Sequence, residues 1–284
     1  MLRKRIDEAV ELSHCQLLTP QAATNEQLTL VHAPDYVQQV VDGAFSDVEM
    51  RRLGFPWSPL MVERSRRSTG ASVAAAQAAL VDGISGNLAG GTHHAFADSG
   101  QGYCVFNDVC VAARVVKKQN SIRKSLVIDC DVHQGNGTAS IAANDTDLFS
   151  LSMHCDKNYP FRKTSGDLDV ALPEGTTDEV YLCKLKTALD QACETFEPEM
   201  VFYLAGADPF EGDRLGHLRI SKHGLRLRDE IVFEFCVAKS LPVAFCMAGG
   251  YAPNVNDIVD IHYETVCVAS RIFQRLKSSK ICST

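Results

Sequence analysis

The sequence predicts an α/β fold: a single domain over residues 1–284 with three layers, α/β/α, around a mostly parallel sheet. From Gly90 onward, apolar runs of roughly four to seven residues alternate with longer amphipathic segments, the pattern of strands and helices that follow each other along the chain. Polar residues suited to chemistry stand directly after several of these runs. No internal repeat, low-complexity tract or Pro/Ser-rich linker marks a domain boundary.

The first 85 or so residues are predicted to be helical. Thr24 is a candidate N-cap, because Glu26 and Gln27 follow it in the manner of a capping box. Gly70 is expected to break the longest segment, since glycine is a poor helix former. The predicted helical segments are Arg3–Leu12, a short turn after Thr24, Pro34–Val41 and Ser58–Val81.

The rest of the chain is predicted to alternate strands with helices. The expected strands are Leu126–Ile128, Leu148–Met153, Met200–Ala205 and Pro242–Met247. The expected helices are Asp178–Phe196, Leu225–Lys239 and Ile258–Leu276. Such alternation produces a parallel sheet with helices on both faces. Because open parallel sheets bind ligands at the carboxyl ends of their strands, the polar residues that follow these strands are expected to meet in one crevice.

The charge balance argues against two classes of partner. The 284 residues include 35 Asp and Glu against 28 Lys and Arg, a net charge of −7, with 45% apolar residues. This acidic balance disfavours general binding to nucleic acid or to anionic membranes. The longest uncharged stretch, Ser240–Asn256, contains two prolines and a glycine pair, so it is not expected to span a membrane. The oligomeric state does not follow from the sequence.

The cysteines indicate the compartment. Eleven cysteines occur without a C-x-x-C motif or a short regular spacing, and several lie inside apolar runs. This pattern is typical of buried free thiols in a reducing compartment rather than of a disulfide framework or a zinc finger. The N-terminal residues lack the apolar centre of a signal peptide. We therefore expect a cytoplasmic protein, or a nuclear one if the source is eukaryotic.

Three residues form a candidate metal site. Asp131 and His133 are two apart in an extended segment after a predicted strand, so their side chains leave the same side of the chain and can bind one ion. Asp208 follows another predicted strand. Two carboxylates and one imidazole suit Zn²⁺ with an open position for water, and would also accept Fe²⁺. Taken singly, each motif is also compatible with an ordinary turn or loop.

Two histidines and a tyrosine suggest acid-base chemistry. His93 and His94 follow a glycine pair, and consecutive imidazoles are an unusual choice for a core because each needs partners for both ring nitrogens. One imidazole can act as a general base while its neighbour, in a different protonation state, stabilises developing charge. The alternative is a pair in an exposed loop. Tyr251, which follows Gly249 and Gly250, offers a phenol that can donate a hydrogen bond to an oxyanion.

Taken together, five ordered motifs resemble the histone deacetylase superfamily. They are GGTHHA at 90–95, GYCVFND at 102–108, DCDVHQGNG at 129–137, AGADPF at 205–210 and GGY at 249–251. The HQGNG form looks most like class IV histone deacetylases and their bacterial relatives. The resemblance implies an arginase/deacetylase-like fold and zinc-dependent removal of an acetyl or longer acyl group from the side-chain amine of lysine, or from a related N-acyl amine.

The resemblance also implies a role for each site residue. The implied zinc ligands are Asp131, His133 and Asp208. His94 would be the general base and later the acid, with His93 as its electrostatic partner. Asp129 would orient His93, and Asn136 would contact His94. Tyr251 would donate the hydrogen bond that stabilises the transition state.

Further residues are implied for the substrate and for a second ion. Gly102 and Tyr103 resemble one wall of the channel that holds the acyl-lysine stem, and Tyr159 is a candidate for the opposite wall. The implied substrate is an acylated lysine in a protein or peptide, or an acylated small amine. A structural potassium ion is implied at Asp129, Asp131, His133, Ser152 and Met153.

The chain departs from the family at two points. Asn136 stands where many members have Asp, and a neutral amide raises the basicity of histidine less than a carboxylate does. His94 is therefore expected to stay unprotonated near neutral pH. Family members usually begin with a strand and a rim loop, so we expect a catalytic domain that lacks the usual N-terminal strand, roughly twenty residues shorter at the front.

Two other functions stay open. An arginase-like hydrolase would need a second Asp in a D-x-H-x-D run, and Gly135 occupies that position. A non-catalytic, metal-stabilised acyl-lysine binding protein would bind metal without turnover. The length of the acyl chain does not follow from these residues.

Overall fold

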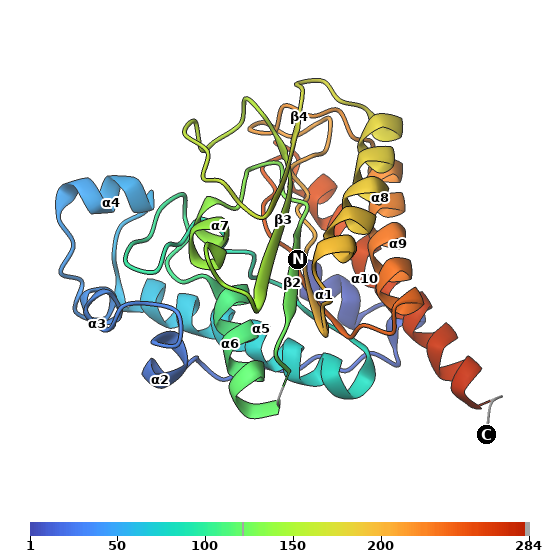
Figure 1. The fold of residues 1–284 in the computed structure, drawn as a ribbon, viewed down its shortest axis with the longest axis horizontal. Coiled ribbons are helices and arrows are strands. Elements are labelled where there is room, and N and C mark those ends of the chain that lie inside the picture. Colours follow the sequence, from blue (N-terminus) through green and yellow to red (C-terminus); the bar gives the residue numbers. More distant parts are fainter. Residues whose placement is uncertain (121, 282–284) are drawn as a thin grey trace.

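A six-stranded sheet, parallel throughout, forms the middle layer of the molecule (Figure 1). The computed structural model describes residues 1–120 and 122–281. The strand order is β1-β6-β5-β2-β3-β4. The strands are β1 (Ile84–Asn87), β2 (Ser125–Asp129), β3 (Leu148–Cys155), β4 (Leu168–Leu172), β5 (Met200–Leu204) and β6 (Val243–Cys246). This sheet confirms the predicted α/β fold class.

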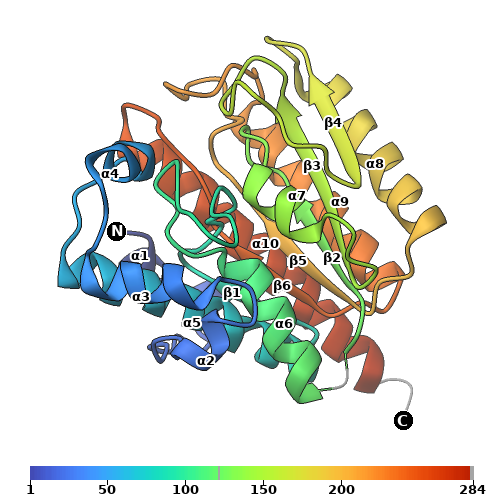
Figure 2. The same cartoon turned by 60° about the vertical axis from the view of Figure 1, so that its left-hand side comes forward.

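Helices cover both faces of the sheet (Figures 1 and 2). Helices α5 (Pro59–Asp82) and α6 (Asp108–Asn120) lie on one face, whereas α8 (Asp178–Thr195), α9 (Lys222–Ala238) and α10 (Val255–Ile281) lie on the other. The remaining helices are α1 (Leu2–Asp7), the short 3₁₀ helix η1 (Val10–Leu12), α2 (Asn25–Leu28), α3 (Pro34–Asp42), α4 (Asp47–Leu53) and α7 (Asn136–Ala142). Along the described part of the chain, no helix is both long and apolar enough to cross a membrane.

The central strands are buried on both sides. In β2, Val127 packs into the core beneath α5 and α6, whereas its neighbours Leu126 and Ile128 enter the core beneath α8 to α10. This alternation explains why the strand is continuously apolar in sequence, because both of its faces are covered. Two packed cores therefore hold the sheet and fix the carboxyl ends of its strands.

The predicted strands and the three C-terminal helices are confirmed, with small differences at their ends. Strands β1 and β4 and helices α4, α6 and α7 were not predicted. Strands β1 and β4 are the outermost strands and are only partly buried, so neither has an unbroken apolar run. Ile84 pairs with Val243, and this long-range pairing defines β1.

The prediction of one helix over Arg3–Leu12 is wrong, because the segment forms α1 and η1 with extended backbone at Ala9 between them. The interruption lets both Ile6 and Leu12 enter one core. Six residues apart on a continuous helix, they would point in different directions. The capped turn is confirmed, since Thr24 and Gln27 form a reciprocal capping box at α2.

Gly70 does not break α5, which is continuous from Pro59 to Asp82. The extended segment around Gln21 crosses the helix there, and a Cβ atom on Gly70 would overlap the carbonyl oxygen of Gln21. The same segment is held by a hydrogen bond from the Ala23 amide to the Arg66 carbonyl, 2.9 Å. Glycine therefore allows close packing of two backbones rather than a helix end.

Gly70→Ala is expected to destabilise the protein, although alanine is the better helix former. Helix propensity alone would raise the free energy of unfolding by about 1 kcal/mol. The overlap with Gln21 should instead lower it by about 1–3 kcal/mol, as overpacking does. Urea unfolding would measure the change. Ala74→Gly, at an exposed position of the same helix, is the control for propensity. A Gly70→Ala variant as stable as the parent would contradict this account of the crossing.

Candidate active site

The candidate site lies at the carboxyl edge of the sheet, where the direction of winding changes. From β2 the chain continues outward to β3 and β4, and it returns to the other side of β2 with β5. A crevice opens at such a switch point in parallel sheets. Asp131 and His133 follow β2, and Asp208 follows β5. The two adjacent strands therefore deliver the predicted metal ligands to the same place.

The three predicted ligands converge. Atoms of Asp131, His133 and Asp208 that can bind a metal lie within 4.8 Å of one another, and all three residues are buried. Nδ1 of His133 lies 2.9 Å from Oδ1 of Asp131 and 3.1 Å from Oδ2 of Asp208. Two carboxylates and one imidazole are a donor set typical of a catalytic zinc site with an open position.

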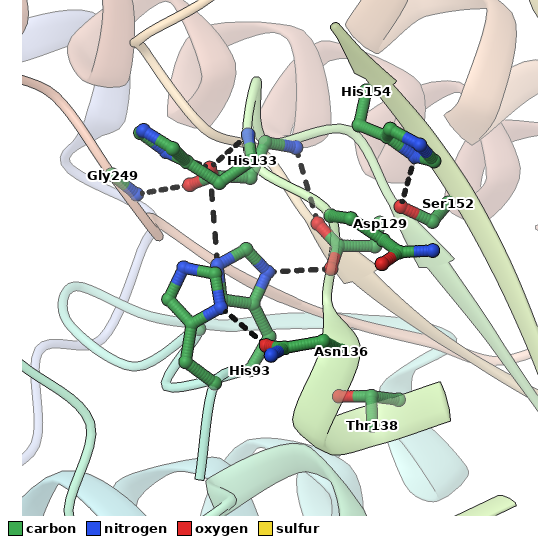
Figure 3. Close-up of polar contacts among 12 residues, drawn as sticks. His93, Asp129, His133, Asn136, Thr138, Ser152, His154 and Gly249 are labelled. Atoms are coloured by element: carbon green, nitrogen blue, oxygen red, sulfur yellow. Dashed lines mark hydrogen bonds and ion pairs between the residues drawn. The ribbon is translucent and has the colours of Figure 1, made fainter. Parts of the chain in front are cut away.

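Backbone amides and a glycine shape this cradle. The Gly249 amide donates to Oδ2 of Asp131 at 2.8 Å (Figure 3), and the Val132 amide donates to Oδ1 of Asp208 at 2.9 Å. A Cβ atom at Gly249 would overlap Oδ2 of Asp208 and lie 2.6 Å from Oδ2 of Asp131. Any side chain at this position would fill the space between the carboxylates. The residues present therefore fit a small divalent cation.

The charges in the cradle are interdependent. Burial opposes ionisation of Asp131, but the charges and hydrogen bonds of His93 and His133 hold the pKa of Asp131 far below its usual range. Burial and the charge of Asp131 raise the pKa of Asp208 to about 7. Burial opposes the charged form of His133, yet the two carboxylates raise its pKa to about 11. A divalent cation would compensate both carboxylates and replace the proton that His133 shares with them.

The tandem histidines lie next to the cradle and have different partners. Their rings are 4.1 Å apart. Nδ1 of His93 donates to Oδ2 of Asp129 at 2.6 Å, whereas Nδ1 of His94 donates to the amide oxygen of Asn136 at 2.7 Å (Figure 3). The structure therefore brings both predicted pairs together. Because Nδ1 of His94 carries the hydrogen in this bond, its Nε2 is the atom able to accept a proton.

These partners give the two imidazoles opposite protonation states. Burial lowers the pKa of His93, but the carboxylates of Asp129 and Asp131 outweigh it and raise that pKa to about 9. Burial and the charge on His93 hold the pKa of His94 well below its usual value, against a weaker opposing effect of Asn136. Near neutral pH, His93 is therefore charged and His94 is neutral. A neutral imidazole beside a charged one is suited to act as a general base.

Tyr251 also lies beside the cradle. Its ring is 6.0 Å from that of His133, nearly perpendicular to it. Burial and the nearby Asp131 and Asp208 charges raise the pKa of the Tyr251 phenol, so it keeps its proton. The amide of Tyr251 donates to Oδ2 of Asp213 at 2.6 Å. A protonated phenol in this position can donate a hydrogen bond to an oxygen bound in the cradle.

Gly102 and Tyr159 line the approach to His94. The rings of Tyr159 and His94 are 4.9 Å apart and nearly perpendicular. A Cβ atom on Gly102 would lie 2.8 Å from the His94 ring and 3.2 Å from Tyr159. Tyr103 differs from the prediction of a simple wall residue: it is 54% exposed and stacks on Phe55, with 6.0 Å between the rings. Tyr103 and Phe55 therefore form an outer rim.

The residues predicted to bind potassium lie on two neighbouring strands. Asp129 of β2 pairs in register with Ser152 of β3, and Met153 is fully buried beside Ser152. Potassium binding by this group stays a prediction. His154 directly follows the predicted strand Leu148–Met153, but it is not among the residues that converge on the metal cradle. His154 lies within β3, and its Nδ1 contacts the Ser152 hydroxyl at 3.0 Å (Figure 3). The same atom lies 4.0 Å from Asp169 of β4.

Sequence reasoning missed several residues that hold the site in place. Buried Asp108 accepts hydrogen bonds from the Gly91 and Thr92 amides and the Thr92 hydroxyl, directly before the tandem histidines. Asp213 accepts from Tyr251 and also from the Leu215 and Gly216 amides. Asp108 is the last residue of the motif at 102–108 and Asp213 lies three residues after the motif at 205–210, but neither position indicates which groups the carboxylate binds.

His32 is a third such residue. Its Nδ1 donates to the Phe96 carbonyl at 3.0 Å, and its Nε2 accepts from the Asn107 amide at 3.0 Å. Residues 96 and 107 are the two ends of the loop that contains Gly102 and Tyr103. His32 comes from a distant segment, between α2 and α3, and no local pattern connects it with the site.

Comparisons with known proteins agree with this geometry. Residues 1–266 match the histone deacetylase domain family. A protein of Picosynechococcus sp., described as uncharacterized, is 42% identical over 247 residues, which are 87% of this chain and 82% of that protein. Histone deacetylase 2 of Arabidopsis thaliana is 33% identical over 252 residues, 86% of this chain and 65% of that protein. The crystal structure of an HDAC homolog complexed with SAHA matches with a TM-score of 0.82 and 27% identity, covering 95% of this chain and 77% of that one.

Protonation of His32 is expected to destabilise the protein in acid. Burial lowers the pKa of His32 to about 4, below the value of about 6.5 in an unfolded chain. As the pH falls from 6.5 toward 4, the unfolded state binds the proton first, so the free energy of unfolding should decrease by up to about 1.4 kcal/mol per pH unit. Urea unfolding at several pH values would measure this slope.

The matched variants are His32→Gln and His223→Gln. Glutamine at position 32 retains a donor and an acceptor without titrating, so its slope should be shallower than that of the parent. The same substitution at the exposed His223 should leave the slope unchanged. Parallel curves for the parent and His32→Gln would exclude His32 as the source.

Proposed function

The chain belongs to the histone deacetylase family, and from this premise we propose that it is a zinc-dependent amidohydrolase that removes an acetyl or longer acyl group from lysine. Membership in this family makes it a metal-dependent deacetylase. The proposal adds zinc as the metal and the side-chain amine of lysine, or a related N-acyl amine, as the substrate. Fe²⁺ would suit the same donor set.

One observation carries the proposal. A neutral imidazole, His94, and a protonated phenol, Tyr251, both lie beside a buried set of two carboxylates and one imidazole. A general base, a cation cradle and a hydrogen-bond donor around one point are the groups that amide hydrolysis requires.

The residues suggest the following division of labour. Zinc held by Asp131, His133 and Asp208 would polarise the substrate carbonyl and acidify a water molecule. Nε2 of His94 takes the proton from the attacking water. Tyr251 donates a hydrogen bond to the carbonyl oxygen as negative charge develops on it. His94 then returns the proton to the leaving amine, while charged His93 stabilises the negative charge of the site.

The approach to His94 supports a long, narrow substrate. Gly102 leaves room beside the His94 ring because it lacks a side chain, and Tyr159 borders the same space. In the proposed binding mode, an unbranched acyl-lysine side chain would pass between these residues. Phe55 and Tyr103 at the rim would contact the rest of the protein, peptide or small amine. Trp57, in contrast, packs on α3 and donates to the Val40 carbonyl at 2.8 Å.

Two further assignments complete the proposal. Potassium would bind at Asp129, Asp131, His133, Ser152 and Met153 and stabilise the loop that carries the zinc ligands. We also propose a cytoplasmic location, or a nuclear one in a eukaryote. It is supported by the ten cysteines in the described part of the chain, all of which are free thiols.

Hydrolysis of lysine peptides that carry acetyl through myristoyl groups would test the proposed function. We expect turnover by the zinc-loaded protein on at least one acyl chain, with loss on chelation and recovery on adding one equivalent of Zn²⁺. Tyr251→Phe should reduce kcat by about 10²–10³ with little change in KM, because it removes a donor used in the transition state.

The outcomes separate the alternatives. Metal binding without turnover on any acyl chain would favour a non-catalytic acyl-lysine binding protein. Two equivalents of metal per chain would favour an arginase-like centre. Undiminished turnover by Tyr251→Phe would remove Tyr251 from the mechanism while leaving the metal centre in place.

Asn136→Asp is expected to move the acidic limb of the pH-kcat profile upward. A carboxylate beside Nδ1 of His94 raises the pKa of that imidazole more than an amide does, so the base becomes protonated at higher pH. Asn144→Asp, in the exposed turn at the other end of α7, adds the same charge away from His94 and should leave the profile unchanged. An acidic limb at the same pH in both variants would be evidence against His94 as the base.

A further inference from the structure

A fully buried arginine lies behind the metal cradle. Arg228 of α9 is the largest side chain among those with less than 2% exposure. Its Nη1 donates to the Gly206 carbonyl at 2.6 Å and contacts the Cys130 carbonyl at 3.4 Å. Cys130 immediately precedes Asp131, and Gly206 lies two residues before Asp208. One guanidinium therefore contacts the backbone of both loops that carry the metal-binding carboxylates.

Arg228 is itself held firmly. Its Nε and Nη2 donate to Oδ1 of Asp229 at 2.9 and 2.8 Å. The Tyr203 hydroxyl from β5 donates to the same carboxylate, and the Thr265 hydroxyl from α10 donates to Oδ2 at 2.6 Å. This network anchors the guanidinium to the strand and the helix that surround it.

Stability alone does not explain such a pair. A buried ion pair is often no more stabilising than apolar side chains of similar volume, because both charges lose their hydration. The helices packed on this face of the sheet offer mainly apolar side chains to the core. A charged side chain at this point instead supplies what an apolar one lacks, namely donors for two backbone carbonyls at adjacent strand ends.

We propose that Arg228 is a positioning residue that sets the separation of Asp131 and Asp208. This inference rests on the metal centre of the proposed function. The two loops are also joined directly, by the Val132 amide to Asp208 and by the Cys130 amide to the Leu204 carbonyl at 3.1 Å. Loss of Arg228 therefore weakens metal binding without abolishing it.

The double variant Arg228→Met/Asp229→Asn isolates this role. It removes both charges, so the net charge near the cradle is unchanged, and asparagine still provides a partner for the Tyr203 and Thr265 hydroxyls. The two carbonyls lose their donor. The Kd for Zn²⁺, measured by competition with a chromogenic chelator, should rise about 10- to 100-fold, as it does when groups that support metal ligands are removed. The midpoint of thermal unfolding of the metal-free protein, measured alongside, should change little.

Two further variants complete the test. Arg228→Lys keeps a charge paired with Asp229 but lacks the planar fork that reaches carboxylate and carbonyls together, so its Kd should also rise. Arg226→Met, on the same helix but in a surface pair with Glu230, is the matched control and should bind Zn²⁺ like the parent.

Each outcome decides the matter. Zinc affinity equal to that of the parent in both Arg228 variants would overturn the inference, even if the thermal midpoint falls, because the role would then be structural only. If Arg228→Met/Asp229→Asn does not fold, the Kd of Arg228→Lys decides alone. A parent chain that binds no Zn²⁺ would overturn the proposed metal centre and this inference with it. Parent binding with unaffected variants would overturn only the inference.

Discussion

The structure depends on holding two buried carboxylates, Asp131 and Asp208, side by side. Like charges at this distance repel, and burial removes the water that would screen them. Their charge is compensated by the His133 imidazole between them and by amides of Gly249 and Val132 that donate to them. These donors come from the loops after β2 and β6, so the arrangement exists only when neighbouring strands are in register. A divalent cation would neutralise the remaining negative charge of the two carboxylates. The strand register that holds them together is therefore also what creates the metal site.

Repulsion between buried like charges also determines the protonation of His93 and His94. Two adjacent imidazoles cannot both be protonated in a buried site at low cost. The Asp129 carboxylate accepts a hydrogen bond from His93 and stabilises its charged form, whereas the neutral amide of Asn136 accepts from His94 without favouring a second proton on that ring. The carboxylate of Asp129 and the amide of Asn136, seven residues apart, therefore give the two histidines different roles: His93 is a charged group and His94 is a base. Gly135 lies between Asp129 and Asn136 in the chain, and a side chain there would overlap Asp129.

Much of the site was predictable because its signals are local. Asp131 and His133 stand two apart after an apolar run, and that spacing alone directs both side chains to one side. Gly249 belongs to one of the motifs. Its two roles, donating an amide hydrogen bond to Asp131 and leaving space between the two carboxylates, follow only from the distances in the structure. His154 is a polar residue directly after a predicted strand, as Asp131 and His133 nearly are. The pairing of β3 with β4 nevertheless places it near Asp169. Gly70 was misread for a similar reason, since the segment it accommodates is some fifty residues away in the chain.

By itself the sequence determined the α/β alternation, the buried strands, the metal ligands and the resemblance to deacetylases, because periodicity and motif spacing are properties of adjacent residues. Only the tertiary structure decided which distant groups support them. Asp213 accepts from the Tyr251 amide, and His32 joins the two ends of the loop that contains Gly102 and Tyr103. Arg228 contacts the backbone of both metal-binding loops. The physical reason is that a hydrogen bond forms between groups close in space. Where the two partners are many residues apart, their proximity arises from the packing of the whole sheet.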